Sequence, residues 1–91
     1  MLTPVYLSSF EKSYKRLRKG GKVSRADVEE LVLMISNYET LPFKYKDHKL
    51  SGEYEGYREC HLKYDLLLIY KIKKVGSTLI LKNIGSHSEL F

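Results

Sequence analysis

Apolar residues recur with helical spacing near the start of the chain. From Phe10 to Leu17 they stand at intervals of four and three, the pattern of one buried stripe on a helix. Ser8 followed by Glu11 has the form of a capping box, and Gly20-Gly21 supplies the left-handed conformation that ends a helix. The pattern therefore predicts a helix that begins at Ser8 and ends at these glycines.

A second helical pattern follows almost at once. Ser24 can cap its start, with Asp27 in the first turn, where the helix dipole favours a carboxylate. The helix should end before Leu41-Pro42, because the residue before a proline avoids helical angles. Seven apolar residues cover much of its circumference, so we expect it to be largely buried: Val28, Leu31, Val32, Leu33, Met34, Ile35 and Tyr38.

The second half of the chain changes to residue types that favour strands. Residues 42–55 are polar and predict a loop. Further strands are predicted over residues 57–62, 65–72 and 78–84, in addition to a short one over residues 4–7. The links between the later three are short, Lys63-Tyr64 and residues 73–77, so these strands should form an antiparallel meander, followed by a terminal turn.

Two helices ahead of a small, mainly antiparallel sheet predict an α+β fold in a single domain of residues 1–91. One face of the sheet should pack on the helices and leave the other free to bind a ligand. A chain of this length can build only one modest core, which excludes a two-domain enzyme.

Composition excludes several classes of protein. Cys60 is the only cysteine and cannot form an internal disulfide, as small secreted domains usually require. The first six residues have none of the features of a signal peptide, and the longest apolar run, residues 66–70, is too short to cross a membrane. We therefore expect a cytoplasmic protein that does not interact with a membrane.

Positive charge is concentrated in one segment. Sixteen Lys and Arg against eleven Asp and Glu give a net charge of +5, which favours a polyanionic partner. Residues 12–25 hold seven of these bases and no acid, whereas the rest of the chain has a net charge of −2. The segment is either a solvated helix face or a docking surface formed by Lys12, Lys15, Arg16, Arg18, Lys19, Lys22 and Arg25.

Candidate catalytic groups lie in the second half. Asp65 follows His61 by four residues across a predicted turn, and His87 follows the last strand, so the meander can bring all three to one edge. His48 lies in the predicted loop. Taken singly, a histidine in a small domain is more often a surface or hydrogen-bonded residue than a catalyst.

Several blocks of the chain together resemble one family. They are residues 45–52, 56–61 with Asp65, 68–71 and the ending Gly85-Ser86-His87-Ser88-Glu89-Leu90-Phe91. In order and spacing they are similar to the YafQ-type toxins of the RelE superfamily, the mRNA interferases of bacterial type II toxin–antitoxin systems. The match covers residues 45–91, and the first half agrees only in its two-helix layout.

The resemblance implies a RelE-like fold with a curved sheet, and cleavage of mRNA in the ribosomal A site by the ribose 2′-hydroxyl, without a metal or other cofactor. It implies two partners, the ribosome with its mRNA and a cognate acidic antitoxin. The matching functional residues are His48, His61, Asp65, His87 and Phe91. Asn83 stands where relatives carry an arginine, and Leu66 where a tryptophan can follow the aspartate.

Asparagine supplies no positive charge to the transition state. Either a neighbour such as Lys46, Arg58, Lys82 or a protonated histidine substitutes for the missing arginine, or the enzyme is slower. In our hypothesis His87 is the general acid and His48 or His61 the base, while Asp65 orients an imidazole or is itself the base. Phe91 either stacks on a displaced base or closes the core. Three alternatives remain open: a metal hydrolase with the histidines and Asp65 as ligands, a non-catalytic RNA-binding module, and a ribosome-independent RNase.

Overall fold

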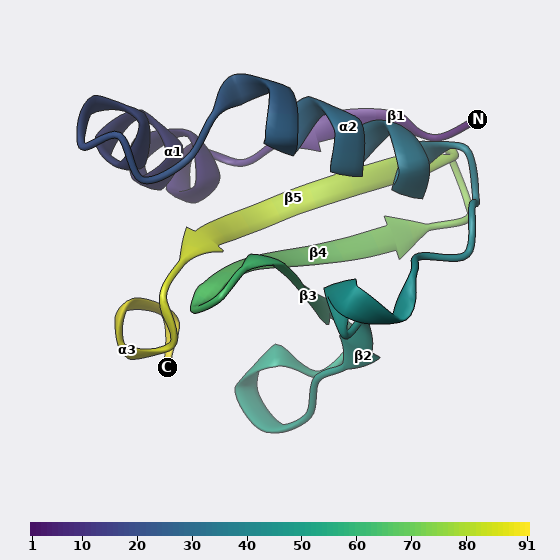
Figure 1. The fold of residues 1–91 in the computed structure, drawn as a ribbon. Coiled ribbons are helices and arrows are strands. Elements are labelled where there is room, and N and C mark those ends of the chain that lie inside the picture. Colours follow the sequence, from purple (N-terminus) through teal and green to yellow (C-terminus); the bar gives the residue numbers. More distant parts are fainter.

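A computed structural model describes all 91 residues and has helices packed on a five-stranded sheet (Figure 1). This confirms the predicted α+β class. Two short 3-10 turns, η1 (Phe43–Tyr45) and η2 (Gly52–Tyr54), flank the second strand. The main elements are β1 (Thr3–Tyr6), α1 (Ser8–Lys19), α2 (Arg25–Ser36), β2 (His48–Lys49), β3 (Arg58–Lys63), β4 (Leu66–Lys73), β5 (Thr78–Gly85) and α3 (His87–Leu90).

The strands lie in the order β1-β5-β4-β3-β2. Strands β2 to β5 pair antiparallel, which confirms the predicted meander, and β1 pairs parallel to β5 with Thr3 opposite Thr78. The first and last strands of the chain are therefore neighbours. Because β1 leads directly into α1, this pairing fixes α1 across β5.

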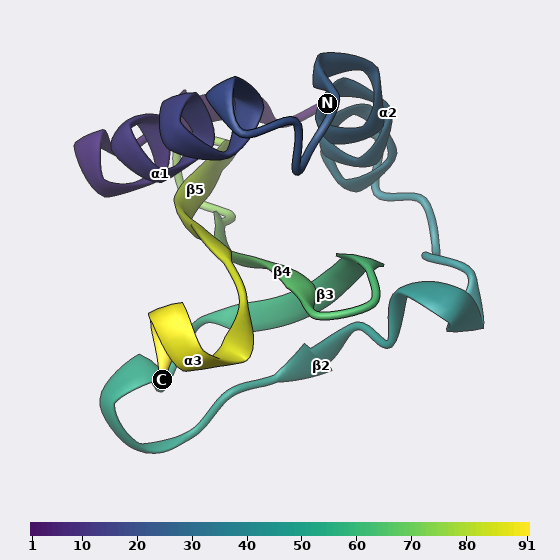
Figure 2. The same cartoon turned by 60° about the vertical axis from the view of Figure 1, so that its left-hand side comes forward.

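The main core lies between the sheet and helices α1 and α2, which cover one of its faces (Figures 1 and 2). The predicted apolar stripes are buried at Phe10 and Leu17 in α1 and at Val28, Leu31, Val32 and Ile35 in α2. The prediction was wrong for Leu33 and Tyr38, which are 52% and 58% exposed. The second helix is thus buried on one side rather than all round.

The predicted capping box at Ser8 does not form. Leu7 is the N-cap of α1 and makes no side-chain cap. Its amide donates instead to the carbonyl oxygen of Leu81 at 3.0 Å, so the strand pairing continues to the first residue before the helix. The end of α1 and the start of α2 agree better with prediction, since Gly21 is left-handed (φ 68°) and the Ser24 hydroxyl accepts from the Asp27 amide at 3.1 Å.

The segment predicted as a loop, residues 42–55, contains β2 in addition to η1 and η2. In β2, His48 lies opposite Glu59 of β3. The turn after β3 also differs from the prediction by one residue: it comprises Tyr64 and Asp65, and Asp65 is left-handed (φ 54°), a conformation that aspartate tolerates.

The face of the sheet opposite α1 and α2 is only partly free. A second apolar cluster covers it, in which Leu90 of α3 packs with Leu67 and Ile69 of β4. The predicted terminal turn is the helix α3, and its first turn is closed by a capping box between Ser86 and Glu89. No helix of the structure has the length and apolar composition needed to span a membrane.

Candidate active site

His87 and Asp65 meet at one end of the sheet. The Asp65 Oδ1 atom accepts a hydrogen bond from the backbone amide of His87 at 3.0 Å and lies 3.3 Å from Nδ1 of its ring. The two residues come together because α3 directly follows β5, while the β3–β4 turn returns beside it. The ring of His61 is centred 6.0 Å from the ring of His87. The three residues predicted to converge therefore do so.

Protonation of the Asp65 carboxylate at low pH should release α3 from its contact with Asp65. The amide of His87 is the main cause that holds the pKa of the Asp65 carboxyl below its ordinary 3.8, and the His87 ring adds to it. Since the pKa is lowered in the folded state, this anchoring is complete above about pH 4 and is lost as pH falls through the lower native value. An NMR titration should show the His87 amide signal moving below pH 4; in Asp65→Asn this transition should be absent, and its persistence would contradict the assignment.

Glu59 is a site residue that the sequence analysis missed. It lies on β3 two residues before His61, so strand alternation puts both side chains on one face, and the pairing with β2 brings His48 to it. Its Oε1 atom lies 3.5 Å from Nε2 of His61 and 3.6 Å from Nε2 of His48. Glu59 is only 3% exposed. A buried carboxylate thus faces two imidazoles, and the i, i+2 spacing of Glu59 and His61 was the available signal.

The two histidines beside Glu59 differ in whether they have a ring nitrogen without a hydrogen-bond partner. Nδ1 of His48 lies 2.8 Å from the carbonyl oxygen of Lys46, so both of its ring nitrogens face acceptors. Nδ1 of His61 has no such partner, and its ring is nearer to His87. His61 is therefore the better placed of the two to exchange a proton with a bound ligand.

A cavity of about 290 Å³ opens beside His61, Asp65 and His87, and three lysines line it. Lys46 was predicted as a supporting residue, whereas Lys44 and Lys63 were not, because each belongs to an element whose position depends on long-range packing. The lining residues are Lys44, Lys46, His61, Lys63, Tyr64, Asp65 and His87. The cavity can accept an anion beside two imidazoles.

Phe91 borders this region from the end of the chain. Its ring is centred 6.1 Å from the ring of His87 and 5.2 Å from that of Tyr54, which meets it edge-on. Phe91 is 57% exposed, so it is not the plug that closes the core. Stacking of Phe91 on a displaced base stays a prediction.

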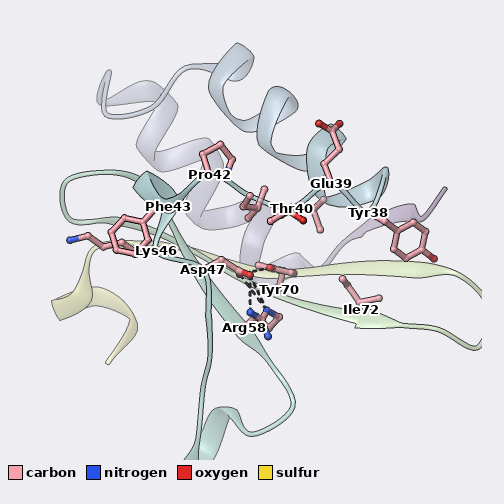
Figure 3. Close-up of a pocket in the computed structure, with 12 residues that line it drawn as sticks. Tyr38, Glu39, Thr40, Pro42, Phe43, Lys46, Asp47, Arg58, Tyr70 and Ile72 are labelled. Atoms are coloured by element: carbon pink, nitrogen blue, oxygen red, sulfur yellow. Dashed lines mark hydrogen bonds and ion pairs between the residues drawn. The ribbon is translucent and has the colours of Figure 1, made fainter.

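Arg58 does not join the histidines. It alternates with Glu59 along β3 and points to the helix-covered face, where its guanidinium binds both oxygens of Asp47, at 3.2 and 2.8 Å to Oδ2 and 3.3 Å to Oδ1. Figure 3 shows Arg58 and Tyr70 converging on Asp47 in a separate cavity of about 460 Å³. Asp47 and burial of the guanidinium act oppositely on Arg58, and the net pKa is raised. Its position favours a structural role.

Three other predicted positions lie outside the basic cavity. Lys82 Nζ lies 5.5 Å from the centre of the Tyr57 ring, beside Lys71 Nζ at 5.4 Å. The Asn83 side-chain oxygen accepts a hydrogen bond from the Ile84 amide at 2.9 Å. Leu66 is buried in the main core. The Lys82 side chain thus lies against Tyr57, just before β3, and the Asn83 side chain is held by the next residue of β5.

The seven bases of residues 12–25 do not form one uniform free surface. Arg16 pairs with Glu89 at 2.6 Å, Arg25 with Glu29 at 2.7 Å, and Arg18 lies over the Tyr14 ring at 5.8 Å. Lys12, Lys15, Arg16 and Lys19 line one shallow hollow on α1. The bases of the segment that have no carboxylate partner are thus Lys12, Lys15, Arg18, Lys19 and Lys22.

The predicted functional residues do not form a set of metal ligands. No group of three or more His, Cys, Asp or Glu side chains has the geometry to hold a metal ion. His48 and His61 each direct Nε2 toward Glu59. His87 instead directs Nδ1 toward Asp65. The arrangement is that of two imidazole–carboxylate groups side by side.

Comparisons with known proteins place the chain in a family. A family model described as "Bacterial toxin of type II toxin-antitoxin system, YafQ" matches residues 2–91. The mRNA interferase toxin YafQ of Escherichia coli K12 is 35% identical over 94% of this chain and 91% of its own. The chain in a crystal structure of a metal-bound toxin from Helicobacter pylori has 46% sequence identity to this chain. Both chains are fully covered, and the TM-score is 0.94. A structure of the E. coli DinJ–YafQ complex is 32% identical over 100% of this chain and 99% of that chain, with a TM-score of 0.85. The chain therefore belongs to the YafQ family of bacterial toxins of type II toxin–antitoxin systems.

Proposed function

We propose that the chain is a ribosome-dependent mRNA endonuclease that acts in the bacterial cytoplasm and is inhibited by a cognate acidic antitoxin. The observation that carries this proposal is the meeting of His61, His87 and Asp65 beside a cavity lined by three lysines. The relatives named mRNA interferase support an endoribonuclease activity for this chain. An anion site beside two imidazoles fits the phosphate of an RNA chain.

The reaction requires three groups. A base removes the proton of a ribose 2′-hydroxyl, whose oxygen attacks the adjacent phosphorus. The bond from phosphorus to the 5′-oxygen then breaks, and an acid protonates that oxygen. The products are a 2′,3′-cyclic phosphate and a 5′-hydroxyl end. Histidine suits both proton transfers, because either of its forms is accessible near neutral pH.

His87 is the general acid in this scheme. Asp65 lies 3.3 Å from Nδ1 of its ring, which orients the ring and leaves Nε2 to donate a proton to the leaving oxygen. His61 is the base, since its Nδ1 is free and Glu59 lies beside its Nε2. His48 shares Glu59 and supports that carboxylate. Asp65 thus has the orienting role rather than that of the base.

The charge of the transition state is met by lysines. Lys44, Lys46 and Lys63 line the cavity that would hold the scissile phosphate. Positive groups aimed at the phosphorane oxygens stabilise the charge that develops there. Asn83 offers at most a hydrogen bond, and its side-chain oxygen is engaged by the Ile84 amide. Lys44 in η1, Lys46 just after it and Lys63 at the end of β3, whose Nζ also lies 3.4 Å from Asp27, therefore take over the function of an arginine on the last strand.

Removal of transition metals is expected to leave the activity intact. Because the two imidazole–carboxylate groups supply both proton transfers, no step requires a bound metal. Addition of 1,10-phenanthroline, which removes metals such as zinc and copper but leaves the magnesium that ribosomes need, should change the cleavage rate by less than twofold. A loss that is restored by added metal would favour the metal-hydrolase alternative.

Cleavage of a defined mRNA with and without ribosomes tests the proposal. We expect cleavage within the coding sequence only when translating ribosomes are present. Cleavage of free RNA at the same rate would favour the ribosome-independent RNase. Binding to RNA or ribosomes with no cleavage in either reaction would favour the non-catalytic module.

The exposed lysines of α1 are the part of the basic surface that fits ribosomal RNA. Lys15→Gln/Lys19→Gln should weaken ribosome binding and reduce the slope of log affinity against log salt by about 1.4 to 1.8, because each lost phosphate contact contributes about 0.7 to 0.9. Lys73→Gln/Lys74→Gln removes the same charge at the β4–β5 turn and is the matched control. Equal slopes for both double variants would return α1 to the role of a solvated face.

The same surface suits the antitoxin. The DinJ–YafQ complex shows that a relative assembles with a partner protein, which supports a cognate antitoxin for this chain. Complementary charge speeds association and suppresses wrong partners, so an acidic segment is the expected chemistry of the partner.

A further inference from the structure

The position of α3 depends on contacts with other elements. It is a single turn of four residues, far shorter than a helix that is stable alone in water. At its C-terminal end the Tyr54 hydroxyl donates to the Leu90 carbonyl oxygen at 3.1 Å, and Leu90 packs into the second apolar cluster. Since His87 begins this helix and Phe91 follows it, whatever orients α3 also orients these two side chains.

Glu89 holds the helix from two directions. Its Oε1 atom accepts from the Ser86 amide at 2.9 Å, and the Glu89 amide donates to the Ser86 hydroxyl at 3.3 Å, which completes the capping box. Its Oε2 atom lies 2.6 Å from Nη2 of Arg16. The hydrogen bonds from Ser86, with Arg16 nearby, lower the pKa of Glu89, so the carboxylate stays charged at neutral pH.

Arg16 is fixed to the body of the protein. It lies in the last turn of α1, next to Leu17, which is buried in the main core. The Arg16–Glu89 pair borders a cavity that is also lined by Asp65 and Ser86, so it lies behind the contact that anchors His87. The pair joins the rigid end of α1 to the one-turn helix that carries the general acid.

We propose that Arg16 is a positioning residue which, through Glu89, holds α3 in the orientation that brings His87 and Phe91 to the basic cavity. This inference rests on the proposed function, in which His87 is the general acid. It assigns to Arg16 a role other than contact with ribosomal RNA, because its guanidinium is already matched by a carboxylate. Its substitution should therefore reduce the catalytic step more than binding.

The size of the effect follows from the exposure of the pair. Arg16 and Glu89 side chains are 57% and 36% exposed, and such pairs typically change an equilibrium by about 1.4- to 5-fold. If only the docked form of α3 is active, the cleavage rate at saturating ribosomes follows the docked fraction. Exchange of the Leu90 and Phe91 amides, which donate within the last turn, follows the undocked fraction, so the ratio of cleavage rate to exchange rate should fall by that factor.

The experiment compares Arg16→Gln with Lys15→Gln. Both variants remove one charge from α1, but Lys15 makes no ion pair or side-chain hydrogen bond with α3, whereas Arg16 pairs with Glu89. We expect Arg16→Gln to lower the ratio of kcat to the exchange rate of the Leu90 and Phe91 amides by about two- to fivefold. Lys15→Gln should show wild-type exchange, and any rise in KM common to both variants reports docking. Arg16→Lys keeps the charge and should recover most of this ratio.

Salt supplies a second test within the wild-type protein. Because the pair is exposed, raising the salt concentration should speed exchange of these amides in the wild type and have no further effect in Arg16→Gln. Thermal unfolding verifies that both variants are folded. A ratio of kcat to amide exchange rate in Arg16→Gln that equals the ratio in Lys15→Gln overturns the inference. If the wild type cleaves no RNA, the proposed function fails, whereas the exchange comparison still decides whether Arg16 holds α3.

Discussion

Replacement of His87 by alanine is expected to lower mRNA cleavage by about 10²- to 10⁴-fold, the usual contribution of a positioned acid. The His87 ring is exposed and packs into no core cluster, so its removal should leave the fold and ribosome binding intact. The amide that anchors α3 to Asp65 belongs to the backbone and remains. Single-turnover cleavage on programmed ribosomes, together with a binding assay, measures both quantities.

Ser88→Ala is the matched control for this variant. Ser88 is the next residue of α3 and is also exposed, and its side chain contacts the Ser86 hydroxyl rather than Asp65. It should cleave within twofold of the wild type. Full activity of His87→Ala would remove the catalytic interpretation of the site, and loss of ribosome binding in parallel with cleavage would assign His87 to binding instead.

Glu59→Gln should lower the cleavage rate by about 10²-fold, because a misplacement of a reacting group by about 1 Å has an effect of that size. Glutamine keeps the shape of the side chain but removes the charge that faces His48 and His61. The free energy of unfolding should stay the same or increase, since removal of a buried charge ends its desolvation cost. Cleavage rate and unfolding free energy would thus change independently.

Glu55→Gln provides the comparison for this substitution. It makes the same chemical change four residues earlier, at an exposed position before β3. Its activity and unfolding free energy should equal those of the wild type. Should Glu59→Gln retain at least half of the wild-type rate, Glu59 would be a packing residue and the base would be set by other contacts.

The parts of the fold that follow local patterns could be predicted from the sequence. The spacing of Phe10 and Leu17 and the cap at Ser24 act within one helix, and each was confirmed. The failures involve contacts far along the chain. Ser8 is not a cap because Leu7 pairs with Leu81, and the two-residue strand β2 exists only through its pairing with β3.

The candidate site also has a part that could be predicted from the sequence and a part that could not. The convergence of His61, Asp65 and His87 followed from one turn and the end of the last strand, so it could be predicted. Glu59 and Arg58 could not be assigned correctly, because the direction of each side chain depends on the phase of β3 relative to the core. Because adjacent residues of a strand point to opposite faces of the sheet, Glu59 lies beside the histidines and Arg58 lies beside Asp47.

The central claim is that the RNA is cleaved by its own 2′-hydroxyl, with His61 and His87 transferring the protons. The most direct measurement uses an mRNA with a single 2′-deoxy nucleotide immediately before the bond that is cut, presented on ribosomes to the wild-type protein. Cleavage at that bond should disappear, while the unmodified mRNA yields a 2′,3′-cyclic phosphate and a 5′-hydroxyl end. Cleavage of the deoxy mRNA at an undiminished rate would contradict the claim, because water rather than the ribose would then be the nucleophile.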